Sequence, residues 1–383
     1  MIYFDNAATS FPKPPQVLRT VNDCLRNYCG NPGRGSHFLS RKSAEVVYSA
    51  REEAASFFGL SGAENVVFTY NDTYALNFAL KGVLRRGDHV IISDMEHNSV
   101  YRPVYRMAHE NMITYNIFDS LCLENPRTPD MICESIEKLI RPRTRLIAVT
   151  HVSNICSAAL PLEEIGKLCR KYKITFLVDA AQSAGHLPID MEKMNIDLLC
   201  APAHKGLLGI QGCGLLLMRD GTGLSPLIEG GSGVNSLVPE MPELPPERYE
   251  AGTISVPAIA ALGEGIRYIN SVGLDAIHEK EKKLFCKAAD MLSDIRGVTV
   301  YAPNHLGSTL LFNVNGSTPE QTSERLDRAG ICVRGGFHCS PLGHKALRTG
   351  ENGAVRASFG LFNTEKEVTE FCRVLKEIAS EGS

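Results

Sequence analysis

The chain has 383 residues, of which 44% are hydrophobic and 22% are charged, and its net charge is −3. This length allows two domains with a sizeable core, and this composition is ordinary for a globular protein. The nearly balanced charge gives no reason to expect nucleic acid or a membrane surface as a partner. Without a visible signal peptide or an apolar run of membrane-spanning length, we expect a cytoplasmic protein.

The first half of the chain alternates short apolar runs with amphipathic stretches. In chain order, we predict a strand at 66–70, a helix at 75–84, strands at 89–93 and 146–150, a helix at 162–172, and strands at 175–178, 198–201 and 214–218. Continuous apolar strands separated by helices indicate a mainly parallel sheet covered on both faces. In such sheets, ligands bind beyond the carboxyl ends of the strands.

The second half indicates a smaller unit. A loop rich in proline, glycine and glutamate precedes predicted helices at 257–272 and 273–297, strands at 298–302 and 308–314, and helices at 319–329 and 365–380. The fold class is therefore α/β, with a large, mainly parallel domain at 15–255 and a smaller α+β domain at 256–383, to which we add the N-terminal segment 1–14.

Lys205 and Asp179 are the most informative pair of residues. Lys205 lies in Ala203-His204-Lys205-Gly206, and Asp179 ends the apolar strand that precedes it. An enzyme that uses pyridoxal 5'-phosphate (PLP) needs a lysine to form a Schiff base and a carboxylate to keep the pyridine nitrogen protonated. A solvated lysine and an ordinary strand-end aspartate are the competing interpretation, so the pair gains weight only from other groups suited to PLP.

Such groups follow several predicted strands. Asp72 and Thr73 precede a helix, where backbone amides and a hydroxyl would suit a phosphate, although a plain helix cap has the same pattern. His97 could stack on the pyridine ring or be a loop histidine. Asn154 and Gln182 could hydrogen-bond the cofactor or the substrate, or be surface amides.

Twelve cysteines are present, and Cys339 has a setting of its own. No CxxC or Cys/His spacing suggests a zinc site, so we expect no metal and mostly buried, reduced thiols. Cys339 lies in an accessible loop marked by two glycines and a proline, where Arg334 and His338 could stabilise a thiolate. Arg356 could bind a substrate carboxylate bidentately or form a structural ion pair.

Together these segments resemble the class V aminotransferase group of fold-type I PLP enzymes, and within it the cysteine desulfurases and selenocysteine lyases. The resemblance spans nearly the whole chain and rests on the order and spacing of its motifs. These are Tyr3-Phe4-Asp5-Asn6-Ala7-Ala8-Thr9, Asn31-Pro32-Gly33-Arg34-Gly35-Ser36-His37, Glu96-His97-Asn98-Ser99, His151-Val152-Ser153-Asn154, Val178-Asp179-Ala180-Ala181-Gln182-Ser183, His204-Lys205, Glu250-Ala251-Gly252-Thr253, residues 334–339 and residues 356–364.

The resemblance implies a role for each cofactor residue. Lys205 would carry PLP and move the Cα proton, Asp179 would hold the pyridine nitrogen, and His97 would stack on the ring. The remaining contacts would come from Gln182 and Asn154 at the phenolic oxygen and from Thr73 and His204 at the phosphate, with Asp72 as a further cofactor-binding residue. Thr253 would reach the phosphate of a second subunit of a homodimer, because the family places its sites at a dimer interface.

The resemblance also implies the reaction. Arg356, with Arg334 and the backbone of Asn6 and Ala7, would hold the carboxylate of L-cysteine or L-selenocysteine. Cys339 would receive the sulfur as a persulfide and pass it to an acceptor protein. Its loop is similar to the short-loop subgroup, whose cysteine follows an Arg-x-Gly-x-His pattern.

Three departures from the family pattern concern the acceptor and the substrate more than PLP. Pro202 stands where the family usually has a hydroxyl residue, Tyr74 follows Thr73 in place of glutamate, and Phe337 replaces a histidine. The function predicted is a PLP-dependent cysteine desulfurase. Selenocysteine lyase or another C–S lyase is the alternative, and an aminotransferase or a non-catalytic PLP-binding protein is less favoured.

Overall fold

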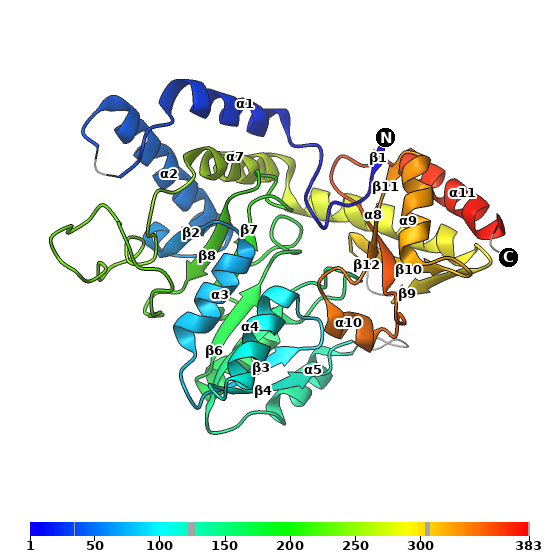
Figure 1. Ribbon diagram of the computed structural model, residues 1–383, viewed down its shortest axis with the longest axis horizontal. Coiled ribbons are helices and arrows are strands. Elements are labelled where there is room, and N and C mark those ends of the chain that lie inside the picture. Colours follow the sequence, from blue (N-terminus) through cyan, green and yellow to red (C-terminus); the bar gives the residue numbers. More distant parts are fainter. Residues whose placement is uncertain (34, 122–126, 303–306, 382–383) are drawn as a thin grey trace.

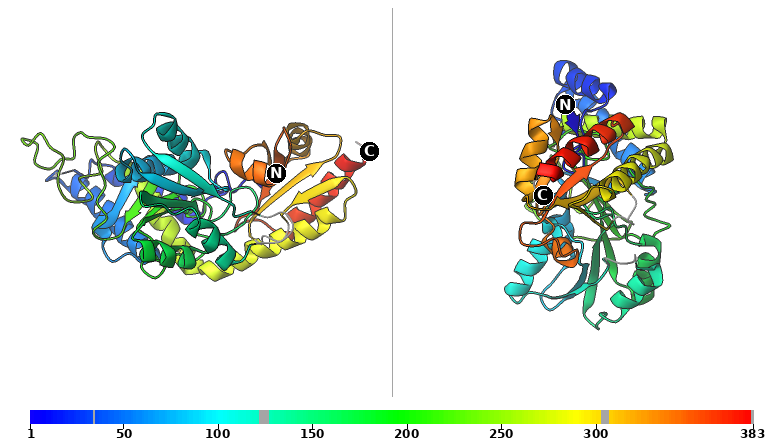
Figure 2. Two further views of the ribbon diagram at one scale, coloured as in Figure 1. Left: turned by 90° about the horizontal axis from the view of Figure 1, so that it is seen from below. Right: turned by 90° about the vertical axis from the view of Figure 1, so that its right-hand side faces the viewer.

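The computed structural model describes residues 1–33, 35–121, 127–302 and 307–381, so Arg34 of the second motif lies outside the described residues. The described chain forms a large sheet at one end and a smaller sheet at the other (Figure 1). Both termini lie beside the smaller sheet, and the loop between β8 and α7 projects at the opposite end in two views (Figures 1 and 2).

The large sheet has seven strands in the order β2-β8-β7-β6-β5-β3-β4, and β8 alone runs antiparallel to its neighbours. Its strands are β2 (Val66–Thr69), β3 (His89–Ser93), β4 (Thr114–Phe118), β5 (Thr144–Thr150), β6 (Thr175–Asp179), β7 (Leu198–Pro202) and β8 (Gly214–Met218). Six of the seven are fully buried or nearly so, because helices cover both faces, whereas the edge strand β4 is half-exposed. This is the mainly parallel sheet predicted from continuous apolar runs.

The helices around this sheet are α1 (Pro15–Asp23), α2 (Phe38–Phe57), α3 (Asp72–Val83), α4 (Asn98–His109), α5 (Pro129–Glu137), α6 (Leu162–Tyr172) and α7 (Val256–Val272), with a π-helical turn at Cys24–Tyr28 and a 3₁₀ turn at Ala63–Asn65. Two of them begin where the site lies. The Asn71 side chain caps α3 by accepting from the amide of Tyr74, and His97 caps α4 by accepting from Ser99. Side-chain caps satisfy helix-start amides and fix the entering chain.

The smaller unit is an antiparallel sheet packed on helices. Its strands, in the order β12-β13-β10-β9, are β12 (Arg334–Gly336), β13 (Ala354–Ser358), β10 (Thr309–Val314) and β9 (Val298–Tyr301). Its helices are α8 (Leu274–Ser293), α9 (Pro319–Arg328), α10 (Pro341–Ala346) and α11 (Glu365–Glu381). The N-terminal strand β1 (Ile2–Tyr3) pairs in parallel with β11 (Ile331–Cys332), which joins the two ends of the chain.

The predicted elements agree closely with these bounds. The sequence left residues 15–57 unassigned, together with the helices α4, α5 and α10 and the strands β1, β4, β11, β12 and β13. The division into domains at 15–255 and 256–383 with 1–14 stays a proposal. Within the described ranges, no helix combines the length and apolar character that crossing a membrane requires.

Candidate active site

A pocket lies at the carboxyl ends of the parallel strands, where the topology predicts a ligand site. Eight of the nine predicted cofactor residues line it. They are Asp72, Thr73, His97, Asn154, Asp179, Gln182, His204 and Lys205. Asn71, Ser99, Thr150, Ala181 and Pro202 complete the lining and were not predicted as ligands.

Lys205 and Asp179 are enclosed in this pocket and influence each other's protonation. Burial lowers the pKa of Lys205, and the nearby carboxyls of Asp72 and Asp179 oppose that shift. Burial raises the pKa of Asp179, while the amide of Ala181 and the charge of Lys205 oppose it. A lysine with a lowered pKa has more of the neutral, nucleophilic amine that Schiff-base chemistry requires.

The loop that carries Lys205 is held closely against its neighbours. A Cβ added at Gly206 would lie 2.2 Å from the carbonyl oxygen of Ala184, so only glycine fits after the lysine. From the N-terminal segment, Ser10 donates its hydroxyl to the carbonyl of Lys205 at 2.9 Å. These contacts fix the direction in which the Lys205 side chain leaves the backbone.

The start of α3 forms one wall of the pocket. Thr73 lies in the first turn of the helix, where backbone amides have no acceptor within the helix. A Cβ added at Gly214 would lie 2.5 Å from the carbonyl carbon of Asn71, so the start of β8 presses directly on this turn. Two buried polar atoms here have no partner among the described residues, Oδ1 of Asp72 and Nδ1 of His204.

Asp72 is unusual because it places a carboxyl group beside a predicted phosphate site. Its pKa is raised well above the usual value by burial, and then by the neighbouring Asp179. The protonated carboxyl is therefore the favoured form, and it can donate to a phosphate oxygen where a carboxylate would repel it.

His97 and Glu96 follow β3, and His97 lines the pocket whereas Glu96 does not. Burial lowers the pKa of His97 to about 4, with Lys205 and Arg356 contributing, so the ring is neutral near pH 7. Glu96 is fully buried, and burial raises its pKa to about 8 although Ser93 and the amide of Thr150 donate to its Oε1. Sequence reasoning did not single out Glu96.

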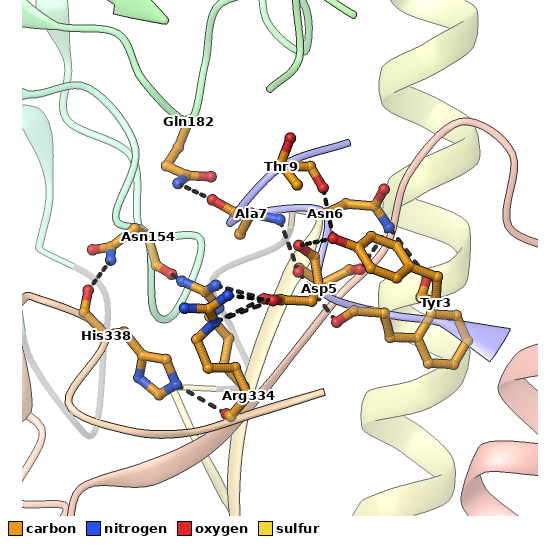
Figure 3. A network of polar contacts seen from close by, with 12 residues as sticks. Tyr3, Asp5, Asn6, Ala7, Thr9, Asn154, Gln182, Arg334 and His338 are labelled. Atoms are coloured by element: carbon orange, nitrogen blue, oxygen red, sulfur yellow. Dashed lines mark hydrogen bonds and ion pairs between the residues drawn. The ribbon is translucent and has the colours of Figure 1, made fainter. Parts of the chain in front are cut away.

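Two arginines and one aspartate make a compact charged group beside the pocket (Figure 3). Arg334 donates from Nη2 to Oδ2 of Asp5 at 2.7 Å, and Arg356 donates from Nη2 to Oδ1 at 2.9 Å. Arg356 also donates to the carbonyl of Asn154 at 3.1 Å, which ties β13 to the pocket wall. Asp5 is a residue that sequence reasoning missed, and its only signal was its place in the N-terminal motif.

The backbone amides of Asn6 and Ala7, predicted to bind a substrate carboxylate, already have a partner within the protein, Ser358. The amide of Ala7 donates to Oγ of Ser358 at 2.9 Å, and the side-chain amide of Asn6 donates to the carbonyl of Ser358 at 3.0 Å. Gln182 donates to the carbonyl of Ala7 at 3.0 Å (Figure 3). The N-terminal segment is therefore part of the pocket wall.

The Cys339 loop is docked on the same wall. The amide of Asn98, next to His97, donates to the carbonyl of Cys339 at 2.7 Å. On each side of the cysteine, Asn154 bonds the loop, donating to the carbonyl of His338 at 2.8 Å and accepting from the hydroxyl of Ser340 at 2.6 Å. Cys339 is itself exposed, so its thiol is accessible from solvent.

His338 does not carry the positive charge that the sequence suggested. Burial lowers its pKa to about 3, and the charge of Arg356 adds to the effect. Its ring is neutral near pH 7 and cannot stabilise a thiolate as a cation, so Arg334 is the charged group of the pair.

Thr253 is the predicted cofactor residue that the chain does not bring to its own pocket. It is exposed, lies near the end of the loop between β8 and α7, and is absent from the pocket lining. Among the described cysteines, Cys29 is the only exposed thiol besides Cys339, and most of the others are buried.

Comparison with known proteins identifies the family of this chain. The model of the family described as "Aminotransferase class-V" matches residues 2–371. The chain belongs to the class V aminotransferase family. Its relatives include proteins named "Probable cysteine desulfurase" from Methanothermobacter thermautotrophicus and Pyrococcus abyssi, each 33% identical. The first alignment covers 100% of this chain and 95% of the relative, and the second covers 99% and 94%.

A solved structure of this class V group has the same fold. The apo structure of a cysteine desulfurase from Thermococcus onnurineus is 32% identical, with a TM-score of 0.90 over 99% of this chain and 95% of that one. The predicted resemblance and fold class are therefore confirmed. The individual site residues stay predictions.

Proposed function

We propose that this protein is a PLP-dependent cysteine desulfurase that converts L-cysteine to L-alanine and leaves a persulfide on Cys339. The hydrogen bond from Asn98 to Cys339 is the observation that carries the proposal. It joins the thiol-bearing loop to the residue beside His97, at the edge of the pocket that holds Lys205. The cysteine desulfurase names of the aligned relatives support the same reaction.

The residues present fit PLP. The first turn of α3 and the unpartnered Nδ1 of His204 offer donors for a phosphate, and Asp179 offers a buried carboxyl for the pyridine nitrogen. When bound, PLP supplies an electron sink that weakens the bonds at the substrate Cα and Cβ. Lys205 would hold the cofactor through its amine and move the proton at Cα, and His97 would cover the ring.

The arginine pair would bind and orient the substrate. Arg356 keeps a buried Nε without a partner among the described residues, and Arg334 has a half-exposed side chain. Bidentate arginine–carboxylate pairs fix direction as well as distance. The substrate carboxylate would join Asp5 on this pair, which directs the side chain of the bound cysteine toward the docked loop.

The sulfur transfer needs no added oxidant, because the substrate carbon is reduced as the sulfur leaves it. The Cys339 thiolate attacks the substrate sulfur, the Cβ–S bond breaks as the S–S bond forms, and the electron pair left on carbon takes up a proton. The products are L-alanine and Cys339 persulfide. Because Cys339 is exposed, an acceptor protein or a thiol can then take the terminal sulfur.

The proposal is tested with the purified holoenzyme and L-cysteine. Equal amounts of alanine and transferred sulfur are expected, with an adduct of about +32 Da, one sulfur atom, on the Cys339 peptide. Cys339→Ala should retain PLP but lose the adduct and the activity, whereas Cys29→Ala, which removes the other exposed thiol, should keep both. Full desulfurase activity in Cys339→Ala would reject the assignment.

The protein is further proposed to be a homodimer in which Thr253 reaches the phosphate of the partner's site. Its exposure and its place near the end of the loop between β8 and α7 support this arrangement. Light scattering of the active enzyme should give twice the chain mass, and a fully active monomer would reject the proposal. A cytoplasmic location stays a prediction.

A further inference from the structure

The Cys339 loop has a backbone conformation that its own residues disfavour. His338 and Cys339 have φ angles of 50° and 58°, two consecutive left-handed residues that are not glycine. Side chains with a Cβ adopt this region only when surrounding contacts compensate its cost. The contacts that hold these two residues therefore determine where the Cys339 thiol lies.

One set of contacts runs through the ring of His338 and away from the cofactor pocket. Nε2 of His338 lies 3.0 Å from the carbonyl oxygen of Arg334, and Nδ1 lies 3.1 Å from Nε2 of His344. Nδ1 of His344 lies 2.8 Å from Oγ1 of Thr349. Both His344 and Thr349 are buried, and the two imidazole rings lie edge to edge, with their centroids 5.3 Å apart and their planes 18° apart.

The direction of this chain of hydrogen bonds is fixed at every step. Burial lowers the pKa of His338 to about 3 and that of His344 to about 4, so each neutral ring has one N–H and one acceptor. A carbonyl only accepts, so the proton of His338 is on Nε2 and its Nδ1 accepts from Nε2 of His344. Nδ1 of His344 must then accept from the hydroxyl of Thr349.

We propose that Thr349 and His344 are positioning residues for the sulfur-accepting cysteine, acting through His338 to hold the Cys339 loop in its left-handed conformation against the cofactor pocket. The inference rests on the proposed function and extends it to two residues with no part in the chemistry. On the inner side, Asn154 and Asn98 bond the same loop, so His338 and Cys339 are held from both sides. Loss of the Thr349 hydroxyl permits the other tautomer of His344, and His338 then loses its donor as well.

The test uses a matched pair of variants of the holoenzyme. Thr349→Val keeps the shape but removes the hydroxyl, and Thr349→Ser restores it. The rate of persulfide appearance on Cys339 in a single turnover should fall about five- to tenfold in Thr349→Val, the effect of one or two lost hydrogen bonds. It should recover in Thr349→Ser. PLP content and the KM for L-cysteine should stay within about twofold in both variants.

Hydrogen exchange gives a readout that is independent of turnover. The amide of Asn98 is bonded to the carbonyl of Cys339, so it should exchange about five- to tenfold faster in Thr349→Val and at the wild-type rate in Thr349→Ser. His344→Phe, which keeps an aromatic ring without a donor, should behave as Thr349→Val does, and it replaces that variant if Thr349→Val does not fold. His344→Gln, which keeps a donor near the Nε2 position, should recover part of the rate.

The outcomes separate this inference from the proposed function. If the wild type forms no persulfide on Cys339, the proposed function fails, while exchange at Asn98 still tests the loop. If the wild type forms the persulfide and both Thr349→Val and His344→Phe match it in rate and exchange, the positioning role is wrong. Equal slowing in Thr349→Val and Thr349→Ser would also overturn it, because only the first removes the hydroxyl.

Discussion

Arg356 and Asp5 form an ion pair in which both residues are buried, with Nη2 of the arginine 2.9 Å from Oδ1 of the aspartate. Burial lowers the pKa of Arg356, and the Asp5 carboxylate is the main influence that opposes this shift. Since a buried charge without a counter-charge is costly, Asp5 balances the charge of the guanidinium and orients it before any substrate arrives.

Arg356→Lys should therefore weaken substrate binding with little effect on the cofactor. A lysine retains the charge but cannot hold Asp5, Asn154 and a carboxylate together, so the KM for L-cysteine should rise about tenfold or more. Steady-state kinetics measure this change. Arg373→Lys, in an exposed ion pair on α11, is the control and should leave the KM unchanged. An unaltered KM in Arg356→Lys would show that the carboxylate binds elsewhere.

Lys205→Ala should abolish the covalent attachment of PLP, because no other lysine among the described residues lines this pocket. Borohydride reduction of the wild type should add the cofactor to the peptide that contains Lys205, as seen by mass spectrometry. The variant should show no such adduct, while Lys193→Ala, at an exposed lysine, should behave as the wild type. A reducible attachment that persists in Lys205→Ala would contradict the assignment.

Asp72→Asn should change how PLP affinity depends on pH. The raised pKa keeps Asp72 protonated at lower pH, and ionisation at higher pH would place a negative charge beside the phosphate. As the pH rises, the wild-type affinity should fall more than that of the variant, since like charges repel in a buried site. Equilibrium dialysis of PLP against both proteins makes the comparison, and parallel curves would exclude a phosphate contact for Asp72.

Glu96→Gln should stabilise the apoprotein increasingly as the pH rises. The folded-state pKa of Glu96 is about 8, against a usual value of 4.5, so between these values the folded state holds a proton that the unfolded state releases. Wild-type stability is then lost as the pH rises through this window, and the glutamine variant lacks that loss. The difference in free energy of unfolding should grow by up to about 1.4 kcal/mol per pH unit.

Urea unfolding of both proteins from pH 5 to pH 8 measures that difference. Glu324→Gln, on the exposed surface of α9, is the control and should follow the wild type at each pH. A difference that is constant across this range would mean that Glu96 is ionised in the folded state as well as in the unfolded state.

The sequence was sufficient for the strand that ends at Asp179 and the strand that precedes Lys205, because buried strands give unbroken apolar runs. It did not indicate β4, whose half-exposed residues Tyr115, Asn116 and Ile117 break such a run at the sheet edge. It placed Cys339 in a loop but gave no sign of the ring pairing between His338 and His344, since tautomers and ring contacts depend on burial.

The partners of Asp5 were also hidden from sequence reasoning. Arg334 and Arg356 are 329 and 351 residues away along the chain, and neither local pattern nor spacing indicates which aspartate they meet. Both arginines were predicted for a substrate carboxylate, whereas the fold also places a protein carboxylate between them. The pairing of β1 with β11 and the parallel bridge between Asp5 and Ser358 bring these distant segments together.

That separation affects when the enzyme can first work in the cell. Ribosomes add about 5–20 residues per second, so Asp5 leaves the ribosome roughly 20 to 70 seconds before Arg356 does. During that interval the large sheet can form with Lys205 in place, but the pair of Arg334 and Arg356 that would bind the substrate carboxylate is not yet complete. A nascent chain that captures PLP early would therefore be unable to take sulfur from cysteine until its last strand, β13, has joined the fold.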